Sequence, residues 1–168
     1  SITVTVTATD GTDTTTETST ALVIANTAPV IDSLTVTPDP ATTTDSLTAV
    51  ATASDVDAAD TATISYEWFV NGNPAGTTDT LDSSNFVKGD SVTVTATATD
   101  GTDTVSSTSA ALVIANSAPT ASIDIDQTSA VTTDTLTATV STADADQDTF
   151  TTTIDWLVDS VSTGETGN

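Results

Sequence analysis

Short acidic clusters carry the most evident chemistry in this sequence. The clustered residues are aspartates two or three positions apart, together with two asparagines that stand close before an Ala-Pro pair. These candidate metal ligands are Asp10, Asp13, Asn26, Asp55, Asp57, Asp60, Asp100, Asp103, Asn116, Asp144, Asp146 and Asp148. Calcium takes about six to eight oxygen ligands from carboxylates, carbonyls and water, which such clusters can supply. Ca2+ is therefore the candidate cofactor, while the alternative that these aspartates only form turns and hairpins stays open.

The composition argues against other chemistry. The 168 residues contain no cysteine, no histidine and a single basic residue, Lys88, against 24 acidic ones, which gives a net charge of -23. Thiol chemistry and a histidine base are thus unavailable, and we expect no enzyme. Such a charge repels nucleic acid and anionic membranes, and it attracts divalent cations. Adaptation to salty water is an alternative explanation of the acidity.

Alternating residues predict β-strands throughout. From Ile2 to Thr9 every even position is apolar and every odd position is threonine, which gives one buried and one wet face. Strands are expected at 30–37, 45–53, 62–71, 91–99 and 104–115, with one or two short strands within 76–87 and a turn at Gly72-Asn73-Pro74. About seven antiparallel strands in ninety residues predict an all-β fold of immunoglobulin-like sandwiches.

An internal repeat sets the domain organisation. Residues 1–14 and 91–104 are identical at twelve of fourteen positions, and residues 21–29 and 111–119 at eight of nine, both at an offset of ninety. The chain thus divides into 1–28, the last two strands of a sandwich; 29–118, a complete repeat; and 119–168, the first three strands of the next. A half sandwich exposes its inner face, so we expect 119–168 to be completed by residues 1–28 of the next unit. That unit is either a continuation of the same chain in a covalent array or a separate chain that exchanges strands.

The same topology predicts where the acidic clusters lie. If strand 30–37 runs away from the linker at 26–29, strand 45–53 returns to it and brings the loop with Asp55, Asp57 and Asp60 to the linker. Strand 91–99 returns as well, so Asp100 and Asp103 should join them beside Asn26. The next cluster, from Asp144 to Asp148, should lie near Asn116. A cation there would fix the angle between neighbouring repeats.

The aromatic residues lie on one face of a predicted strand. Tyr66, Trp68 and Val70 alternate with polar residues, and Ile154, Trp156 and Val158 repeat this pattern in the next copy. We interpret the tryptophans as core anchors between two sheets. A tryptophan that stacks on sugar is the alternative.

These motifs resemble a known group of repeats. The loop Ser54-Asp55-Val56-Asp57 and the strand Tyr66-Glu67-Trp68-Phe69-Val70 are similar to the signature of PKD-type repeats, and the linker Asn26-Thr27-Ala28-Pro29 resembles the joint of cadherin-like repeats. The resemblance departs at Ala58-Ala59-Asp60, where Gly-Asp would follow, and in the absence of Gly-Asp-Gly after the strand.

The resemblance implies a stalk or adhesin repeat of a large surface protein. We therefore expect a structural repeat unit of an extracellular filament or cell-surface adhesin stalk, which assembles head to tail with copies of itself. Surface glycans are further candidate partners, whereas nucleic acid and membrane insertion are not expected. No signal peptide leads the sequence, which suggests an internal or processed segment. The alternative function is a spacer or carbohydrate-binding module of a secreted hydrolase.

Overall fold

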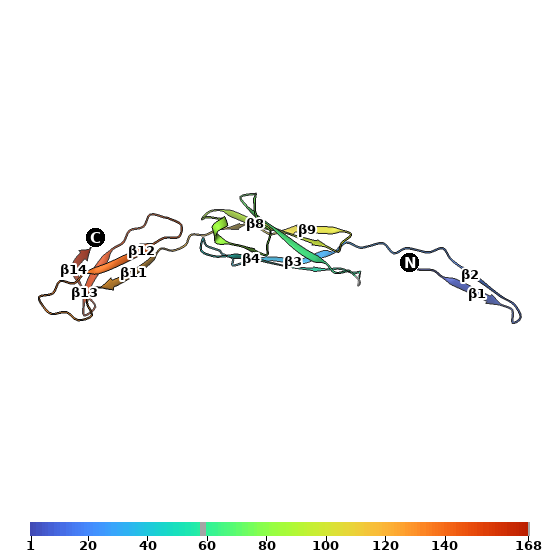
Figure 1. The fold of residues 1–168 in the computed structure, drawn as a ribbon, viewed down its shortest axis with the longest axis horizontal. Helices are drawn as coiled ribbons and strands as arrows, with labels where there is room; N and C mark the ends of the chain where they lie inside the picture. The colour runs from blue at the N-terminus through green and yellow to red at the C-terminus, as the bar shows by residue number, and fades with distance from the viewer. Residues whose placement is uncertain (58–59, 168) are drawn as a thin grey trace.

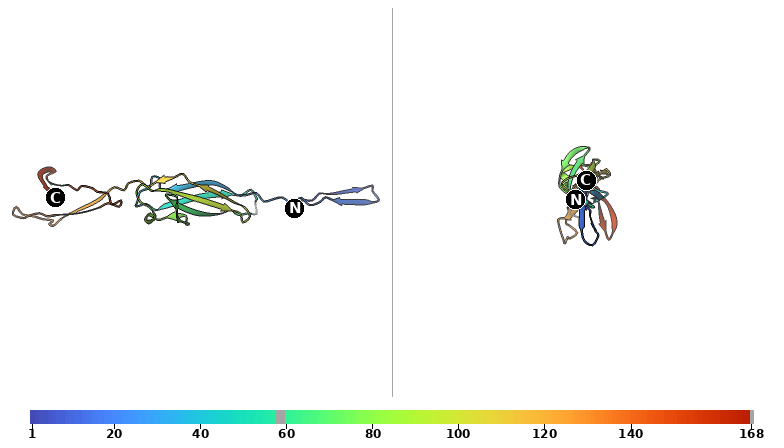
Figure 2. Two further views of the ribbon diagram at one scale, coloured as in Figure 1. Left: turned by 90° about the horizontal axis from the view of Figure 1, so that it is seen from above. Right: turned by 90° about the vertical axis from the view of Figure 1, so that its right-hand side faces the viewer.

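The computed structural model describes residues 1–57 and 60–167, and in this range the chain is all-β, with 50% strand and no α-helix. Three parts follow one another along a single long axis: an N-terminal hairpin, a central sandwich and a C-terminal half-module (Figure 1). The view from above shows the same extended arrangement, with the hairpin and the half-module at opposite ends (Figure 2).

The N-terminal hairpin consists of β1 (Thr5–Thr9) and β2 (Thr14–Thr18), which pair in antiparallel fashion. Its turn is closed by Asp10, whose Oδ1 accepts hydrogen bonds from the N–H groups of Thr12 (2.9 Å) and Asp13 (2.8 Å). Gly11 adopts φ 92° in this turn, a conformation that favours glycine. Every residue from 1 to 28 is exposed, so the hairpin has no second layer to pack against.

The central sandwich, residues 29–118, contains two antiparallel sheets. One sheet has the order β3 (Val30–Thr37), β4 (Leu47–Ser54), β7 (Thr80–Leu81). The other has the order β10 (Leu112–Val113), β8 (Ser91–Thr99), β5 (Thr63–Val70), β6 (Asn73–Gly76), and β9 (Thr104–Thr108) also pairs with β8. A 3-10 turn, η1 (Ser83–Asn85), precedes β8. The two antiparallel sheets confirm the expected all-β sandwich.

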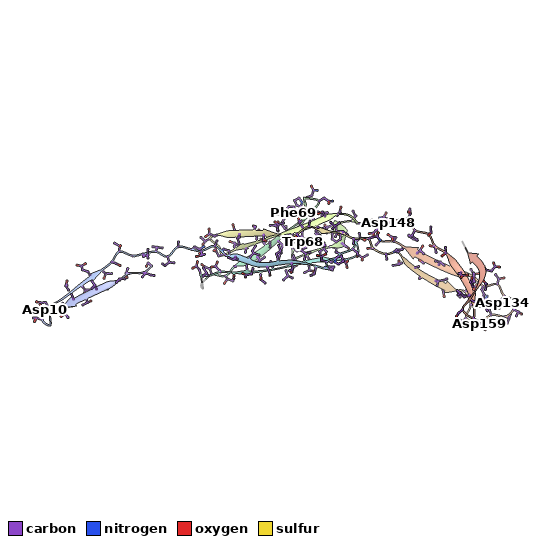
Figure 3. All side chains as sticks on the ribbon, turned by 180° about the vertical axis from the view of Figure 1, so that it is seen from behind. Asp10, Trp68, Phe69, Asp134, Asp148 and Asp159 are labelled. Atoms are coloured by element: carbon purple, nitrogen blue, oxygen red, sulfur yellow. The ribbon has the colours of Figure 1, made fainter. Side chains whose placement is uncertain are left out.

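The core of the sandwich is built around Trp68, which is completely buried. Its indole Nε1 donates a hydrogen bond to the Thr78 carbonyl at 2.9 Å, so the buried ring leaves no polar atom unpaired. The Tyr66 hydroxyl accepts a hydrogen bond from the Ala51 N–H at 3.1 Å and thereby links the two sheets. The interpretation of Trp68 as a core anchor is confirmed (Figure 3).

Two details of the central sandwich differ from the sequence prediction. The turn after β5 consists of Asn71 and Gly72, at φ 51° and 79°, and β6 begins at Asn73, where we expected the turn to continue. A two-residue turn with two positive φ angles matches the twist of a hairpin, and Asn-Gly supplies both angles at low cost. The strand expected at 104–115 is divided into β9 and β10, because Ser109, Ala110 and Ala111 leave the regular ladder between them.

The C-terminal half-module contains two separate two-stranded sheets. β11 (Thr120–Ile125) pairs with β12 (Ala138–Ala143), and β13 (Ile154–Val158) forms a hairpin with β14 (Val161–Gly167). No residue from 118 to 165 is buried. None of the strands described here, β11 to β14, corresponds to β8, β9 or β10, and within residues 118–165 the two sheets share no buried core.

Candidate functional site

The first joint lies between the N-terminal hairpin and the central sandwich. The Asn26 amide Nδ2 donates hydrogen bonds to Oδ2 of Asp100 and to Oδ2 of Asp103, each at 2.9 Å. The backbone N–H of the next residue, Thr27, donates to Oδ2 of Asp57 at 2.7 Å. The linker is thus tied to the turn after β8 and to the loop after β4. The bond from Asn26 lowers the pKa of Asp100, and the N–H groups of Asp103 and Thr102 lower it further.

The loop after β4 shapes its own acidic cluster. Oδ1 of Asp55 accepts the N–H of Asp57 at 2.7 Å, which turns the Asp57 carboxylate toward the linker. Oδ2 of Asp55 is buried and has no hydrogen-bond partner among the described residues. Asp60 donates its N–H to the carbonyl of Asp57 at 2.9 Å. Ala58 and Ala59, at which the sequence departs from the PKD pattern, lie outside the described residues.

The second joint, between the central sandwich and the half-module, repeats the first. The N–H of Ser117 donates to Oδ2 of Asp146 at 2.6 Å, and the N–H of Asp146 donates to Oδ1 of Asp144 at 2.8 Å. These bonds correspond to those of Thr27, Asp57 and Asp55 in the first joint. Two copies of one hydrogen-bond pattern therefore connect each linker to the loop of the repeat that follows it.

Lys88 adds an ionic contact that the first joint lacks in the described structure. Its ammonium group forms an ion pair with Asp148 and donates to Oδ1 of Asn116 at 3.1 Å. The hydrogen bond to Asp148 raises the pKa of Lys88, with smaller contributions from the charges of Asp146 and Asp144. Lys88 belongs to the central sandwich and Asp148, labelled in Figure 3, to the half-module, so this pair spans the joint. Sequence reasoning did not assign Lys88 a partner, because nothing in the local pattern places it beside residue 148.

Asp146 is the most fully engaged carboxylate of the second joint. Besides the Ser117 N–H, it accepts a hydrogen bond from the Thr43 hydroxyl. Its pKa is lowered mainly by Thr43, then by the Ser117 N–H and the charge of Lys88. The Thr43 hydroxyl is also 2.7 Å from the Ser117 hydroxyl. Thr43 is a joint residue that sequence reasoning missed, since a threonine in a polar loop gives no distinguishing signal.

The acidic clusters differ in how well they suit a metal ion. Among the described residues, one group of three acidic side chains brings an oxygen of each within 4.8 Å of the others: Asp144, Asp146 and Asp148. These three could in principle hold a cation, although Lys88 already pairs with Asp148 there. Asp10 and Asp13 lie elsewhere, at the free tip of the N-terminal hairpin (Figure 3). Hydrogen bonds from the backbone N–H groups of Asp13 and then Thr12 lower the pKa of Asp10.

An open apolar face distinguishes the N-terminal hairpin from its copy. Val4 is 67% exposed, whereas Val94, its counterpart ninety residues later, is completely buried. Ile2 and Val6 are likewise exposed, while Val92 and Ala96 are buried. Leu22 and Ile24 correspond in the same way to the buried Leu112 and Ile114. The same sequence pattern is therefore buried in the core of the central sandwich and exposed on the surface of the hairpin.

The C-terminal half-module has the complementary open face. Leu136 is 42% exposed, whereas its counterpart Leu47 is completely buried. Between the two sheets runs a groove of about 260 Å³, whose apolar lining includes Ile123, Val140 and Ile154. Trp156, the counterpart of the fully buried Trp68, is only half-buried. The half-module thus has the inward residues of a sandwich without the strands that would cover them.

Comparison with known proteins adds no relative. No protein-family model, no curated protein and no solved structure matches the chain. Within the part of the chain that the structure describes, no helix has the length and apolar character needed to cross a membrane. The two joints and the two open faces are therefore the features of the chain that point to a function.

Proposed function

We propose that the chain is a structural repeat unit of an extracellular filament or a surface adhesin stalk, built from immunoglobulin-like sandwiches that assemble head to tail. The observation that carries this proposal is the contrast between Val4 and Val94. The same strand is buried in one repeat and exposed in the other, and the strands it would cover are exposed in the half-module. Large exposed apolar faces in a water-soluble β-structure indicate an interaction surface.

The position of the two faces favours a filament over a closed oligomer. The hairpin and the half-module lie at opposite ends of an extended chain (Figure 1). The two surfaces are different, so a contact between them is heterologous, and contacts of this kind propagate in one direction unless a rotation closes a ring. The long axis of the chain then becomes the axis of the filament.

The joints supply stiffness along that axis. Each linker is held by a backbone N–H bonded to a carboxylate, from Thr27 to Asp57 and from Ser117 to Asp146. Charge-assisted bonds of this kind are among the stronger hydrogen bonds in proteins. A stalk needs such joints because free rotation at each linker would turn the extended row of repeats into a flexible coil.

Electron microscopy of the full chain across a concentration series tests this function. β8, the longest strand, has nine residues and spans about 30 Å at roughly 3.3 Å per residue. With a linker of about 10 Å, a repeat rises about 40 Å and a chain about 80 Å. Thin, unbranched fibres with this axial period are expected. Particles that remain single chains at millimolar concentration would exclude the proposal.

We further propose that a calcium ion held by Asp144, Asp146 and Asp148 stiffens the second joint. Bound calcium stabilises the folded state by mass action, so millimolar calcium should raise the melting temperature above that measured with a chelator. The triple variant with asparagine at these three positions is the control, and its melting should not respond. Identical melting temperatures of the parent chain with calcium and with chelator would show that calcium does not stabilise this joint.

A further inference from the structure

We propose that the half-module of one chain receives the N-terminal hairpin of a second copy in one defined register, with Trp156 opposite Val4 and Asp155 opposite Thr5. This inference rests on the proposed head-to-tail assembly and names its contacts. The partner is a second copy because the N-terminal hairpin carries the repeat of the strands that complete the central sandwich.

The edge that receives the partner is fixed by the turn after β13. In the central sandwich, β6 leaves β5 through the Asn71-Gly72 turn, and β8 takes the other edge of β5. In the half-module, β14 leaves β13 through Asp159 and Ser160, which adopt φ 48° and 67°. Val70 and Val158 are the residues that begin these turns, and both share a strand face with the tryptophan of their repeat. β14 therefore takes the edge that corresponds to β6 and leaves the β8 edge of β13 open.

The register follows from the complete sandwich. There, Trp68 lies opposite Val94 and Glu67 lies opposite Thr95. Trp68 corresponds to Trp156 in the half-module, and Val94 corresponds to Val4 in the hairpin. Transferred to the second copy, the same register places Trp156 opposite Val4 and Asp155 opposite Thr5.

Alternation of side chains makes other registers unfavourable. A slip of one residue would turn Val4 and Val6 to solvent and point the threonines that alternate with them at the groove. In the correct register the apolar residues of β1 face the groove lined by Ile123 and Ile154. In the hairpin alone these residues are exposed, so seating them removes apolar surface from water on both copies.

The same placement completes the second joint. In the first joint, Asn26 donates to Asp100 and Asp103, whose counterparts in the hairpin are Asp10 and Asp13. Asn116 corresponds to Asn26, and in the single chain its Nδ2 donates to the Ser117 carbonyl at 2.6 Å. When the hairpin of the next copy is seated, its Asp10–Asp13 turn comes to Asn116, and the amide can make the two bonds that Asn26 makes.

Single cysteines test the register directly, because the chain has none of its own. One preparation carries Asp155→Cys and a second, labelled with ¹⁵N, carries Thr5→Cys; the two are mixed and oxidised. Directly paired strand residues have Cα atoms within disulfide range, whereas diagonal partners two residues away are beyond it. We expect a mixed-mass covalent dimer, formed at least tenfold faster than with Thr7→Cys in place of Thr5→Cys.

The possible results of this experiment distinguish a wrong register from an absence of association between chains. Sedimentation of the reduced mixtures shows whether the chains still associate as the parent chain does. Association with faster cross-linking through Thr7→Cys would overturn the register and leave the filament intact. Absence of association in the parent chain would overturn the proposed function itself. Should the first pair impair association, Leu157→Cys with Thr3→Cys probes the same register two positions along the strands, and no mixed dimer there would also refute it.

Discussion

Replacing Val4 by asparagine should weaken assembly without unfolding the chain. Val4 is 67% exposed in the single chain, and its counterpart Val94 is completely buried in the complete sandwich. Full burial of a valine side chain stabilises by about 1.5–3 kcal/mol, so assembly gains about 1–2 kcal/mol from this residue. Burying an amide with no hydrogen-bond partner costs a further ~1–3 kcal/mol. The sum is about 2–5 kcal/mol, which raises the dissociation constant by between about thirtyfold and several thousandfold.

Sedimentation velocity over a concentration series measures this change, with circular dichroism as the check on folding. The matched control is Thr7→Asn, which places the same side chain three residues away on the opposite face of the alternating segment 2–9. Thr7 is exposed in the hairpin and its hydroxyl lies 3.3 Å from that of Thr16. A change on this face should alter the dissociation constant by less than about fivefold, as for an ordinary surface substitution.

Equal weakening by Val4→Asn and Thr7→Asn would refute the reasoning, because it would show that assembly does not distinguish the two faces of segment 2–9. So would an unchanged dissociation constant for Val4→Asn, which would place the association surface elsewhere on the chain.

Three further predictions concern the sandwich and its joints. Trp68→Ala should lower the free energy of unfolding of the central sandwich by about 3–5 kcal/mol in urea titrations, whereas Trp156→Ala should cost far less in the unassembled chain. Lys88→Gln should loosen the second joint and leave the first unchanged, seen as a greater independence of NMR rotational diffusion between the half-module and the sandwich; equal loosening of both joints would contradict this. The pKa values of Asp100 and Asp146 are lowered, so their bonds stabilise the folded chain fully above the ordinary value of 3.8, and this stabilisation is lost as the pH falls through the lowered pKa of the folded state. Small-angle scattering should then show a more flexible chain at about pH 2.5 than at pH 6, and unchanged scattering would contradict that role.

Much of the fold could be predicted because alternation and repetition are strong signals. Strands β3 and β8 begin and end where the alternating valines and threonines indicated. The position of Trp68 in the core followed from its place among alternating apolar residues. The end of β5 and the division of the last strand were not predicted, since both depend on φ angles and ladder contacts that side-chain pattern does not encode.

The joints were predictable in outline but not in chemistry. The predicted strand directions already placed Asn26 close to Asp100, because in an antiparallel fold every second strand ends at the same end of the sandwich. The role of Asp57 as an acceptor for the linker N–H was not anticipated, and neither was the pair between Lys88 and Asp148. These contacts depend on the angle between repeats, which the sequence of a single repeat does not specify.

Amide hydrogen exchange along residues 2–7 of the N-terminal hairpin tests the central claim most directly. In the single chain, the N–H groups of Ile2 and Val4 bond to Leu22 and Ser19 on the β2 side. Alternation then directs the N–H groups of Thr3, Thr5 and Thr7 to the open edge. Raising the concentration to drive assembly should slow exchange at these three threonines by at least a hundredfold, because they acquire the partners that β8 finds on β5. Fast exchange at Thr3, Thr5 and Thr7 in the assembled protein would contradict completion of the half-module by the hairpin of a neighbouring copy.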